Sequence, residues 1–288
     1  MALKVGLQLF SVKQSMEKDP IATIEKVAEA GYKYVEFANH NGLNDYGCGF
    51  GVSTDVLNQT LEKYGVKLIS INVKPLNLTN IDEIIKYHVA VGSEGLGHVI
   101  DFYANKQEVL DKCLLFNKLG EKCRKAGVAF YIHNHFHEFQ DMGGKCIFDM
   151  ICENTDPEFV SFEFDTYWAM RGSVDPVEYI KKLGRRCKQI HQKDYPKEAY
   201  DKLEIFPQIG YDARINNESY FSGAIADARG RYFTEIGEGI MDIQKIIDAV
   251  NSIGFAKYII LEQDFSDKPE FESITISMKN FKRMRGIE

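Results

Sequence analysis

Ionisable side chains stand where four apolar stretches of this sequence end. The stretch 159–164 alternates apolar and polar residues and runs into Asp165. Three other apolar stretches end in the same way, at the group from His133 to Glu138, at His191 and Lys193, and at Glu262. A charge among core-forming residues is costly unless it is paired, hydrogen-bonded or bound to a metal. If the four ends meet, their three carboxylates and one imidazole are suited to bind a divalent cation.

The donor set also indicates which cation and which chemistry to expect. Oxygen-rich ligation favours Mn²⁺, Mg²⁺ or Co²⁺ over a structural zinc ion, and zinc is kept as an alternative cation. Lys193 follows His191 by two residues and therefore faces the same side of a strand. Its ammonium group is placed to stabilise an oxyanion or to hold a phosphate.

The order of the secondary-structure elements decides whether these ends can meet. Helical patterns end at a glycine, and an apolar strand follows within a few residues, at Gly31, Gly65, Gly127, Gly254 and, more loosely, Gly184. Alternating helices and strands indicate a parallel sheet. The predicted strands are 5–10, 34–37, 68–73, 98–101, 129–134, 160–165, 188–192 and 258–262. Eight such units predict one α/β domain over residues 1–288, a (β/α)₈ barrel, whose active sites lie at the strand C-termini. A doubly wound open sheet is the alternative, but the first strand is not followed by a glycine-rich loop.

Helices are expected between the strands, and one connection is unusually long. The first helix begins at Asp19 and Pro20, and later ones are expected near 106–126, 145–153, 242–252 and 270–283. Residues 195–232, after the seventh strand, are irregular and rich in tyrosine. Loops of this length usually serve a function, so we expect an ordered flap over the barrel mouth. A loop for subunit contacts is the alternative.

Composition excludes several classes of function. The net charge of −7 argues against nucleic acid as a partner, because phosphate binding needs a basic face. No apolar run approaches the roughly 18 residues of a membrane span, and the N-terminal sequence lacks a signal-peptide pattern. The six cysteines form no C-x-x-C pair, which favours reduced thiols in a cytoplasmic protein.

Seven short motifs resemble one family, the xylose isomerase-like barrels known as sugar phosphate isomerases/epimerases. They are GLQLFSV, YVEF, HNHFHEF, FDTYW, IHQKD, GEG and LEQD, and the resemblance spans essentially the whole chain. The family binds its metal through Glu, Asp, His and Glu from strands five to eight. By residue, the resemblance implies Glu138, Asp165, His191 and Glu262.

The sequence departs from the pattern of related ketose epimerases at two positions. His133 stands where those enzymes carry the strand-five glutamate, and His135 competes with Glu138 for that role. Trp168 replaces a histidine that contacts substrate, which indicates a stacking wall for a cyclic or larger substrate. The expected substrate-binding residues are therefore Gln8, Glu36, His133, His135 and Trp168.

The resemblance implies proton abstraction next to a carbonyl group through a metal-bound enediolate. Glu138 and Glu262 would remove and return the proton, with Lys193 as a further catalytic residue. The expected function is a divalent-metal-dependent isomerase or epimerase of a sugar or keto-sugar. Alternatives are a lyase such as an inosose dehydratase or keto-glycoside-cleaving enzyme, an endonuclease on abasic DNA, and a sugar-binding protein without catalysis. Barrels of this kind are often dimers or tetramers, so the resemblance allows a homo-oligomer.

Overall fold

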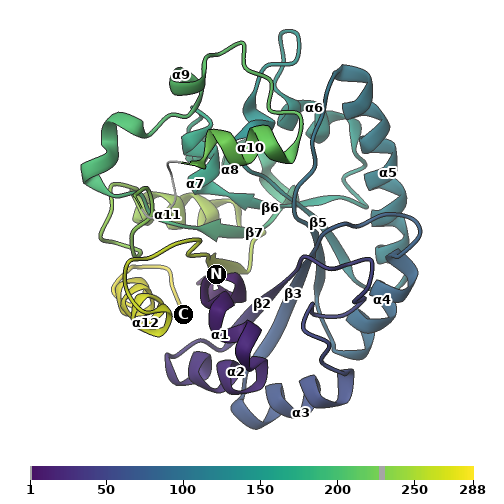
Figure 1. Ribbon diagram of the computed structural model, residues 1–288, viewed down its shortest axis with the longest axis vertical. Coiled ribbons are helices and arrows are strands. Elements are labelled where there is room, and N and C mark those ends of the chain that lie inside the picture. The colour runs from purple at the N-terminus through teal and green to yellow at the C-terminus, as the bar shows by residue number, and fades with distance from the viewer. Residues whose placement is uncertain (1, 227–230) are drawn as a thin grey trace.

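The chain folds into a closed barrel of eight parallel strands, which confirms the predicted (β/α)₈ architecture. The structure, a computed structural model, describes residues 2–226 and 231–288 (Figure 1). Each strand pairs with the next in chain order, and β8 pairs with β1. The strands are β1 (Lys4–Gln8), β2 (Tyr34–Asn39), β3 (Lys67–Val73), β4 (Gly95–His98), β5 (Ala129–His133), β6 (Ser161–Asp165), β7 (Cys187–Gln192) and β8 (Tyr258–Leu261).

Helices surround the barrel, and several begin and end as the sequence indicates. Asp19 caps α2 by accepting a hydrogen bond from the backbone N–H of Ala22, and Gly65 ends α3 in the left-handed conformation. The helices are α1 (Lys13–Lys18), α2 (Pro20–Glu29), α3 (Thr54–Tyr64), α4 (Ile81–Ala90), α5 (Lys106–Lys125), α6 (Ile147–Asn154), α7 (Thr166–Arg171), α8 (Pro176–Leu183), α9 (Phe206–Ile209), α10 (Glu218–Ala224), α11 (Ile243–Ile253) and α12 (Glu270–Phe281). Short 3₁₀ helices are η1 (Leu9–Val12), η2 (His137–Phe139), η3 (Gly184–Arg186) and η4 (Lys197–Lys202).

Strand β4 lies earlier in the chain than the predicted 98–101. Its sequence, GLGH, lacks the β-branched and aromatic residues typical of strands. Both glycines are needed for space, because a Cβ atom on Gly95 would collide with the ring of Tyr131, and one on Gly97 would collide with the side chain of Asn72. Strand formation here depends on packing inside the barrel, which propensity does not reveal.

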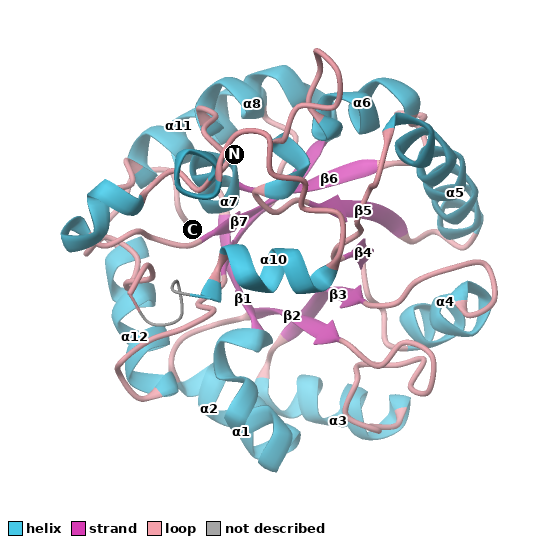
Figure 2. Ribbon diagram, turned by 45° about the horizontal axis from the view of Figure 1, so that its top comes forward, coloured by secondary structure: helices cyan, strands magenta, loops and turns pink. Residues whose placement is uncertain are grey.

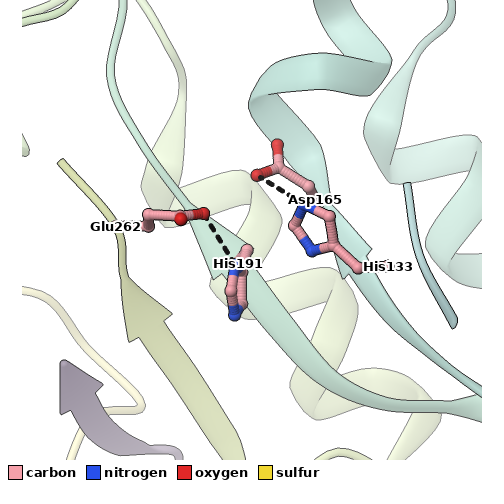
Figure 3. A group of neighbouring side chains, drawn as sticks. All are labelled: His133, Asp165, His191 and Glu262. Carbon is pink, nitrogen blue, oxygen red and sulfur yellow. Dashed lines mark hydrogen bonds and ion pairs between the residues drawn. The ribbon is translucent and has the colours of Figure 1, made fainter. Parts of the chain in front are cut away.

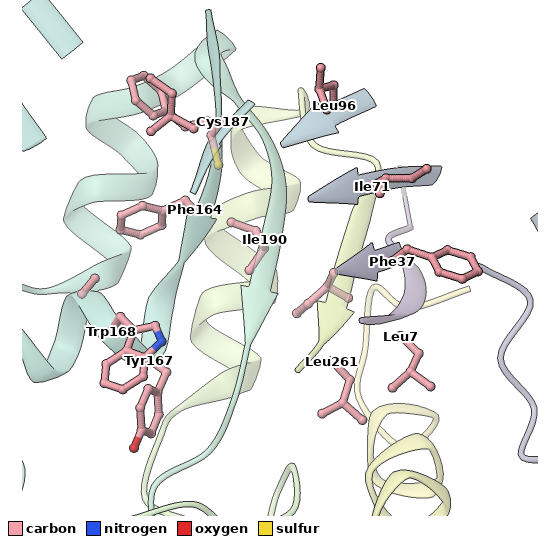
Figure 4. Close-up of a cluster of buried hydrophobic side chains, with 14 of the residues drawn as sticks. Leu7, Phe37, Ile71, Leu96, Phe164, Tyr167, Trp168, Cys187, Ile190 and Leu261 are labelled. Carbon is pink, nitrogen blue, oxygen red and sulfur yellow. The ribbon is translucent and has the colours of Figure 1, made fainter. Parts of the chain in front are cut away.

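The strands divide the molecule into an apolar layer and a polar barrel interior. Outward-facing side chains such as Leu7, Phe37, Ile71 and Leu96 pack in the layer between strands and helices (Figure 4). Their neighbours along the strands, which face inward, include polar residues that are almost fully buried: Gln8, Glu36, Ser70, Asn72, Glu163 and Gln189. Such groups need mutual hydrogen bonds, and this network supports the strand ends at the barrel mouth.

The long connection after β7 is ordered in the described residues and covers the mouth, as predicted. It contains η4, α9 and α10, and α10 crosses over the strand ends (Figure 2). Arg171, only 2% exposed, anchors its first half by donating from Nε to the carbonyl oxygen of Leu203 at 3.1 Å. Phe221 on α10 stacks on Phe136 at a centroid distance of 5.3 Å. Residues 227–230 of the predicted flap lie outside the described residues.

No helix within residues 2–226 and 231–288 combines the length and the apolar character that a membrane crossing requires.

The buried imidazole of His88 on α4 makes stability depend on pH. Burial lowers the pKa of His88 to about 3, whereas a histidine in an unfolded chain titrates near 6.5. Below pH 6.5 the unfolded chain binds a proton that the folded chain does not, so stability falls by about 1.4 kcal/mol per pH unit until the folded pKa is reached. We expect His88 alone to lower the free energy of unfolding by about 2 kcal/mol between pH 7 and pH 5.

Urea unfolding of the wild type and a His88→Leu variant at both pH values measures this contribution. The variant should lose that part of the pH dependence, whatever its stability at pH 7. An identical fall in both proteins would assign the acid sensitivity to other groups.

Candidate metal centre

Four side chains from the ends of β5 to β8 meet at the barrel mouth. His133, Asp165, His191 and Glu262 each offer one ligand atom, and these four atoms lie within 4.8 Å of one another (Figure 3). His191 Nδ1 lies 2.9 Å from Glu262 Oε2, and His133 Nε2 lies 4.0 Å from Asp165 Oδ2. The expected convergence of the four strand ends is therefore present in the fold.

Asp165 joins the end of β6 to the first turn of α7. Its Oδ1 accepts the backbone N–H of Trp168 at 2.7 Å and so caps the helix. Its Oδ2 points the other way and accepts from Lys193 Nζ at 2.7 Å. The backbone of Asp165 is fixed by Asn134, which bonds to both its N–H and its carbonyl oxygen. One oxygen is thus committed to structure, and the other faces the group.

His191 is oriented from below by two buried carboxylates. Its Nε2 lies 2.6 Å from Glu36 Oε1 and 3.2 Å from Glu163 Oε1. Its Nδ1 lies 2.9 Å from Glu262 Oε2, so carboxylates flank both ring nitrogens. Burial opposes the charge of His191, but Glu163 and Glu36 hold the pKa of His191 well above its usual value. Burial and the nearby charge of Glu163 raise the pKa of Glu36 to about 8. The side chains of Gln8, Asn72 and Gln189 donate to these carboxylates, which makes the pair a support for His191.

Lys193 contributes a buried ammonium group beside the four side chains. It is 1% exposed, and its Nζ donates to Asp165 and to Glu262 Oε2. Burial alone would lower the pKa of Lys193, but the surrounding carboxylates raise it above its usual value. Burial opposes ionisation of Glu262, yet Lys193 and His191 hold the pKa of Glu262 well below its usual range. The mouth therefore contains a buried cluster of unlike charges.

Glu138 and Glu36 do not lie where the sequence analysis expected them. Glu138 lies on η2, beyond the end of β5, where its Oε2 accepts the backbone N–H of His135 at 2.9 Å and its Oε1 lies 3.2 Å from His137 Nε2. Burial raises the pKa of Glu138 to about 8, which disfavours the charged form that binds a metal. His133 takes its place in the group. Glu36 is fully buried below His191 and does not line the cavity.

The donor set fits a divalent cation. Two imidazole nitrogens and two carboxylate oxygens, three of these four residues fully or almost fully buried, are typical ligands of borderline metals. The expected set had three carboxylates and one imidazole. Exchanging Glu138 for His133 shifts the preference away from Mg²⁺ and toward Zn²⁺, Co²⁺ or Mn²⁺.

A cavity of about 450 Å³ opens above the four side chains, a volume suited to a small molecule. Among the residues expected to bind substrate, Gln8, His133, His135 and Trp168 line it. The sequence analysis did not select several other lining residues: Lys13, His40, Asn72, Phe221, Phe233 and Asp264. Asp264 and Asn72 could have been selected from their positions at strand ends. Phe221 and Phe233 carry no such signal, because they enter the cavity from the connection after β7.

The cavity wall is divided by chemistry. One part is aromatic, with the rings of Trp168, Phe221 and Phe233. The carboxylates in the described wall, Glu262 and Asp264, both follow β8, while the imidazoles of His133 and His135 come from the end of β5. Such a wall can stack a ring, remove a proton with a carboxylate and donate one from an imidazole.

A family model and curated proteins match this chain. The model of the family described as xylose isomerase-like TIM barrel matches residues 115–284. The chain is similar to inosose dehydratase from Lacticaseibacillus casei, with 26% identity over 147 residues, which are 51% of this chain and 44% of that protein. The alignment thus spans less than half the length of this curated relative.

Solved structures resemble the whole fold. One is a sugar phosphate isomerase/epimerase from Parabacteroides distasonis ATCC 8503, with a TM-score of 0.76 and 22% identity over 100% of this chain and 96% of that chain. Another is the IOLI protein with a bound zinc atom, with a TM-score of 0.66 and 14% identity over 96% of each chain. At these identities the likeness establishes the fold alone.

Proposed function

The chain belongs to the xylose isomerase-like TIM barrel family, and on that premise we propose that it is a metal-dependent lyase acting on a cyclic sugar or polyol ketone. It removes a proton next to the carbonyl group and expels a hydroxyl or alkoxyl group from the next carbon. The relative from Lacticaseibacillus casei, called an inosose dehydratase, supports this reaction class. The substrate class is further supported by Trp168, which lines a cavity of about 450 Å³.

We propose that His133, Asp165, His191 and Glu262 hold one divalent cation. When bound, the ion would polarise the substrate carbonyl group and so acidify the neighbouring C–H bond. The IOLI protein is described with a bound zinc atom, which supports a divalent ion in this fold. Lys193 adds a fixed positive charge beside Glu262 and Asp165, suited to stabilise negative charge that develops on the substrate oxygen.

The distribution of acid–base groups on the cavity wall favours the lyase. The sequence analysis expected epimerisation with Glu138 and Glu262 on opposite faces of the substrate, but Glu138 is not in the wall. A carboxylate after β8 and the imidazole of His135 after β5 are there instead. An elimination needs a base for the carbon-bound proton, and a carboxylate in this position can return that proton to the departing oxygen.

An isomerase or epimerase of a sugar or keto-sugar is the second candidate. Glu262 and Asp264 follow the same strand and both line the cavity. Two carboxylates on one side suit the transfer of a proton between neighbouring carbons along one face of the substrate, which is an isomerisation. The first step, proton removal next to the carbonyl group, is the same in both candidates.

Incubation in D₂O with each of two ketones tests the proposal. The probes are an inosose, which is a cyclic polyol ketone, and D-fructose, each with the protein loaded with Zn²⁺, Co²⁺ or Mn²⁺. We expect metal-dependent deuterium incorporation into the inosose and a product lighter by one water, both detected by mass spectrometry. Exchange with an unchanged carbon skeleton and no loss of water would favour the isomerase. No exchange with either ketone and any of the metals would contradict both candidates.

A further inference from the structure

Two carboxylates follow β8, and their surroundings differ. Glu262 Oε2 accepts from Lys193 Nζ and lies 2.9 Å from His191 Nδ1. The same side chain belongs to the four-residue group at the strand ends. Its Oε2 is therefore engaged by one ammonium group and one imidazole, and a proton on that oxygen would disrupt these contacts.

Asp264 has no such commitments. Its carboxylate accepts no hydrogen bond of 3.5 Å or less from residues 2–226 or 231–288, and its side chain is 22% exposed. It lines the same cavity as Glu262. Its nearest cation is Lys193, whose Nζ lies 3.9 Å from Asp264 Oδ2. Asp264 thus has free lone pairs that face the space a substrate would fill.

Because a general base needs an uncommitted lone pair within reach of the substrate, we propose that Asp264, and not Glu262, removes the proton from the substrate carbon. This inference rests on the proposed function and adds a catalytic residue to it. Glu262 then serves to hold the cation. The resemblance implied that Glu262 both binds the metal and transfers the proton. In this proposal Glu262 binds the metal, and Asp264 transfers the proton.

The proposed step balances within the substrate and Asp264. The carboxylate forms an O–H bond with the proton next to the ketone, and the electron pair of the broken C–H bond moves into the carbon–carbon bond. The carbonyl oxygen takes the negative charge as an enolate. When the C=O bond re-forms, the enolate pair forms a double bond to the next carbon, and the pair of the broken C–O bond leaves with its oxygen, which departs as water or alcohol after taking the proton held by Asp264.

Two variants of Asp264 and one matched control test the inference in the metal-loaded protein. Asp264→Asn and Asp264→Ala should each lower deuterium exchange into the inosose at least about 100-fold. Both should still bind one equivalent of Zn²⁺ with wild-type affinity. Asp267→Asn makes the same charge change at an exposed position of the same loop and should leave exchange within about twofold of wild type.

Chemical rescue separates a base from a structural role. Added formate should restore exchange in Asp264→Ala, because a small carboxylate can enter the vacated space, and should have no effect on Asp264→Asn. Wild-type exchange that persists in both variants would overturn the role of Asp264 and leave the proposed function intact. Loss of exchange together with Zn²⁺ binding, or failure of formate to rescue, would also overturn it. If the wild type itself exchanges neither ketone, the proposed function fails and the inference with it.

Discussion

Replacing Glu262 with glutamine is expected to abolish turnover while the barrel stays folded. The carboxylate of Glu262 balances Lys193 and faces His191 Nδ1. Glutamine has nearly the same shape but no charge, so Lys193 would keep only Asp165 as a directly bonded carboxylate. The site would lose a cation ligand, and we expect turnover to fall by about 10³-fold.

Turnover of the inosose, Zn²⁺ content and thermal unfolding measured on the same preparation separate the possible causes. We expect Glu262→Gln to bind Zn²⁺ more weakly and to unfold within a few degrees of the wild type, since the side chain lies at the mouth and not in the apolar layer. Glu272→Gln on the exposed face of α12 makes the same chemical change away from the cavity and should be as active as the wild type. Full activity in Glu262→Gln would remove this residue from the mechanism.

Substitutions of Glu262 and of Asp264 are expected to have different effects on Zn²⁺ binding. Glu262→Gln should lose turnover together with Zn²⁺ affinity, whereas Asp264→Asn should lose turnover and keep the ion. The two residues stand two positions apart after β8, so any general disturbance of that loop would affect both alike. A clean separation of the two phenotypes therefore reports different chemistry.

The fold could be predicted from sequence because its signals are local. Glycines such as Gly65 and Gly254 end helices in the left-handed conformation, and an apolar strand follows each of them, which is the pattern of a parallel α/β fold. The predicted position of strand β4 is a few residues too late. Its glycines, Gly95 and Gly97, are required by the close approach of Tyr131 and Asn72, and glycine gives no local signal for a strand. The helices α9 and α10 of the long connection depend on contacts with the mouth, such as that of Phe221 with Phe136.

Within the site, the sequence indicated which strand ends converge but not which side chain each end contributes. Asp165 and His191 are paired across β6 and β7 in the register of the sheet, so a strand pattern is enough to bring them together. At β5 the choice among His133, His135 and Glu138 depends on where the strand stops. It stops at His133, and the chain then turns into η2, which carries Glu138 away from the cavity. No periodicity in HNHFHEF marks that turn.

Replacing His133 with alanine is expected to have a large effect on metal binding. His133 lies at the end of β5 with Nε2 toward Asp165 Oδ2 and Nδ1 3.3 Å from Glu163 Oε2. Removing it leaves three of four proposed ligands. We expect His133→Ala to weaken Zn²⁺ binding by more than about 100-fold, measured by calorimetric titration of the metal-stripped protein in competition with a chelator.

Glu138→Gln is the matched variant on the same segment. Burial raises the pKa of Glu138 to about 8 and so favours its neutral form, and glutamine keeps an oxygen that can accept the backbone N–H of His135. We expect this variant to bind one equivalent of Zn²⁺ with affinity within about threefold of wild type. The opposite pattern, with Zn²⁺ binding lost in Glu138→Gln and retained in His133→Ala, would restore Glu138 as the ligand from β5. It would require the turn after His133 to rearrange when the ion binds, since Glu138 now faces His135 and His137.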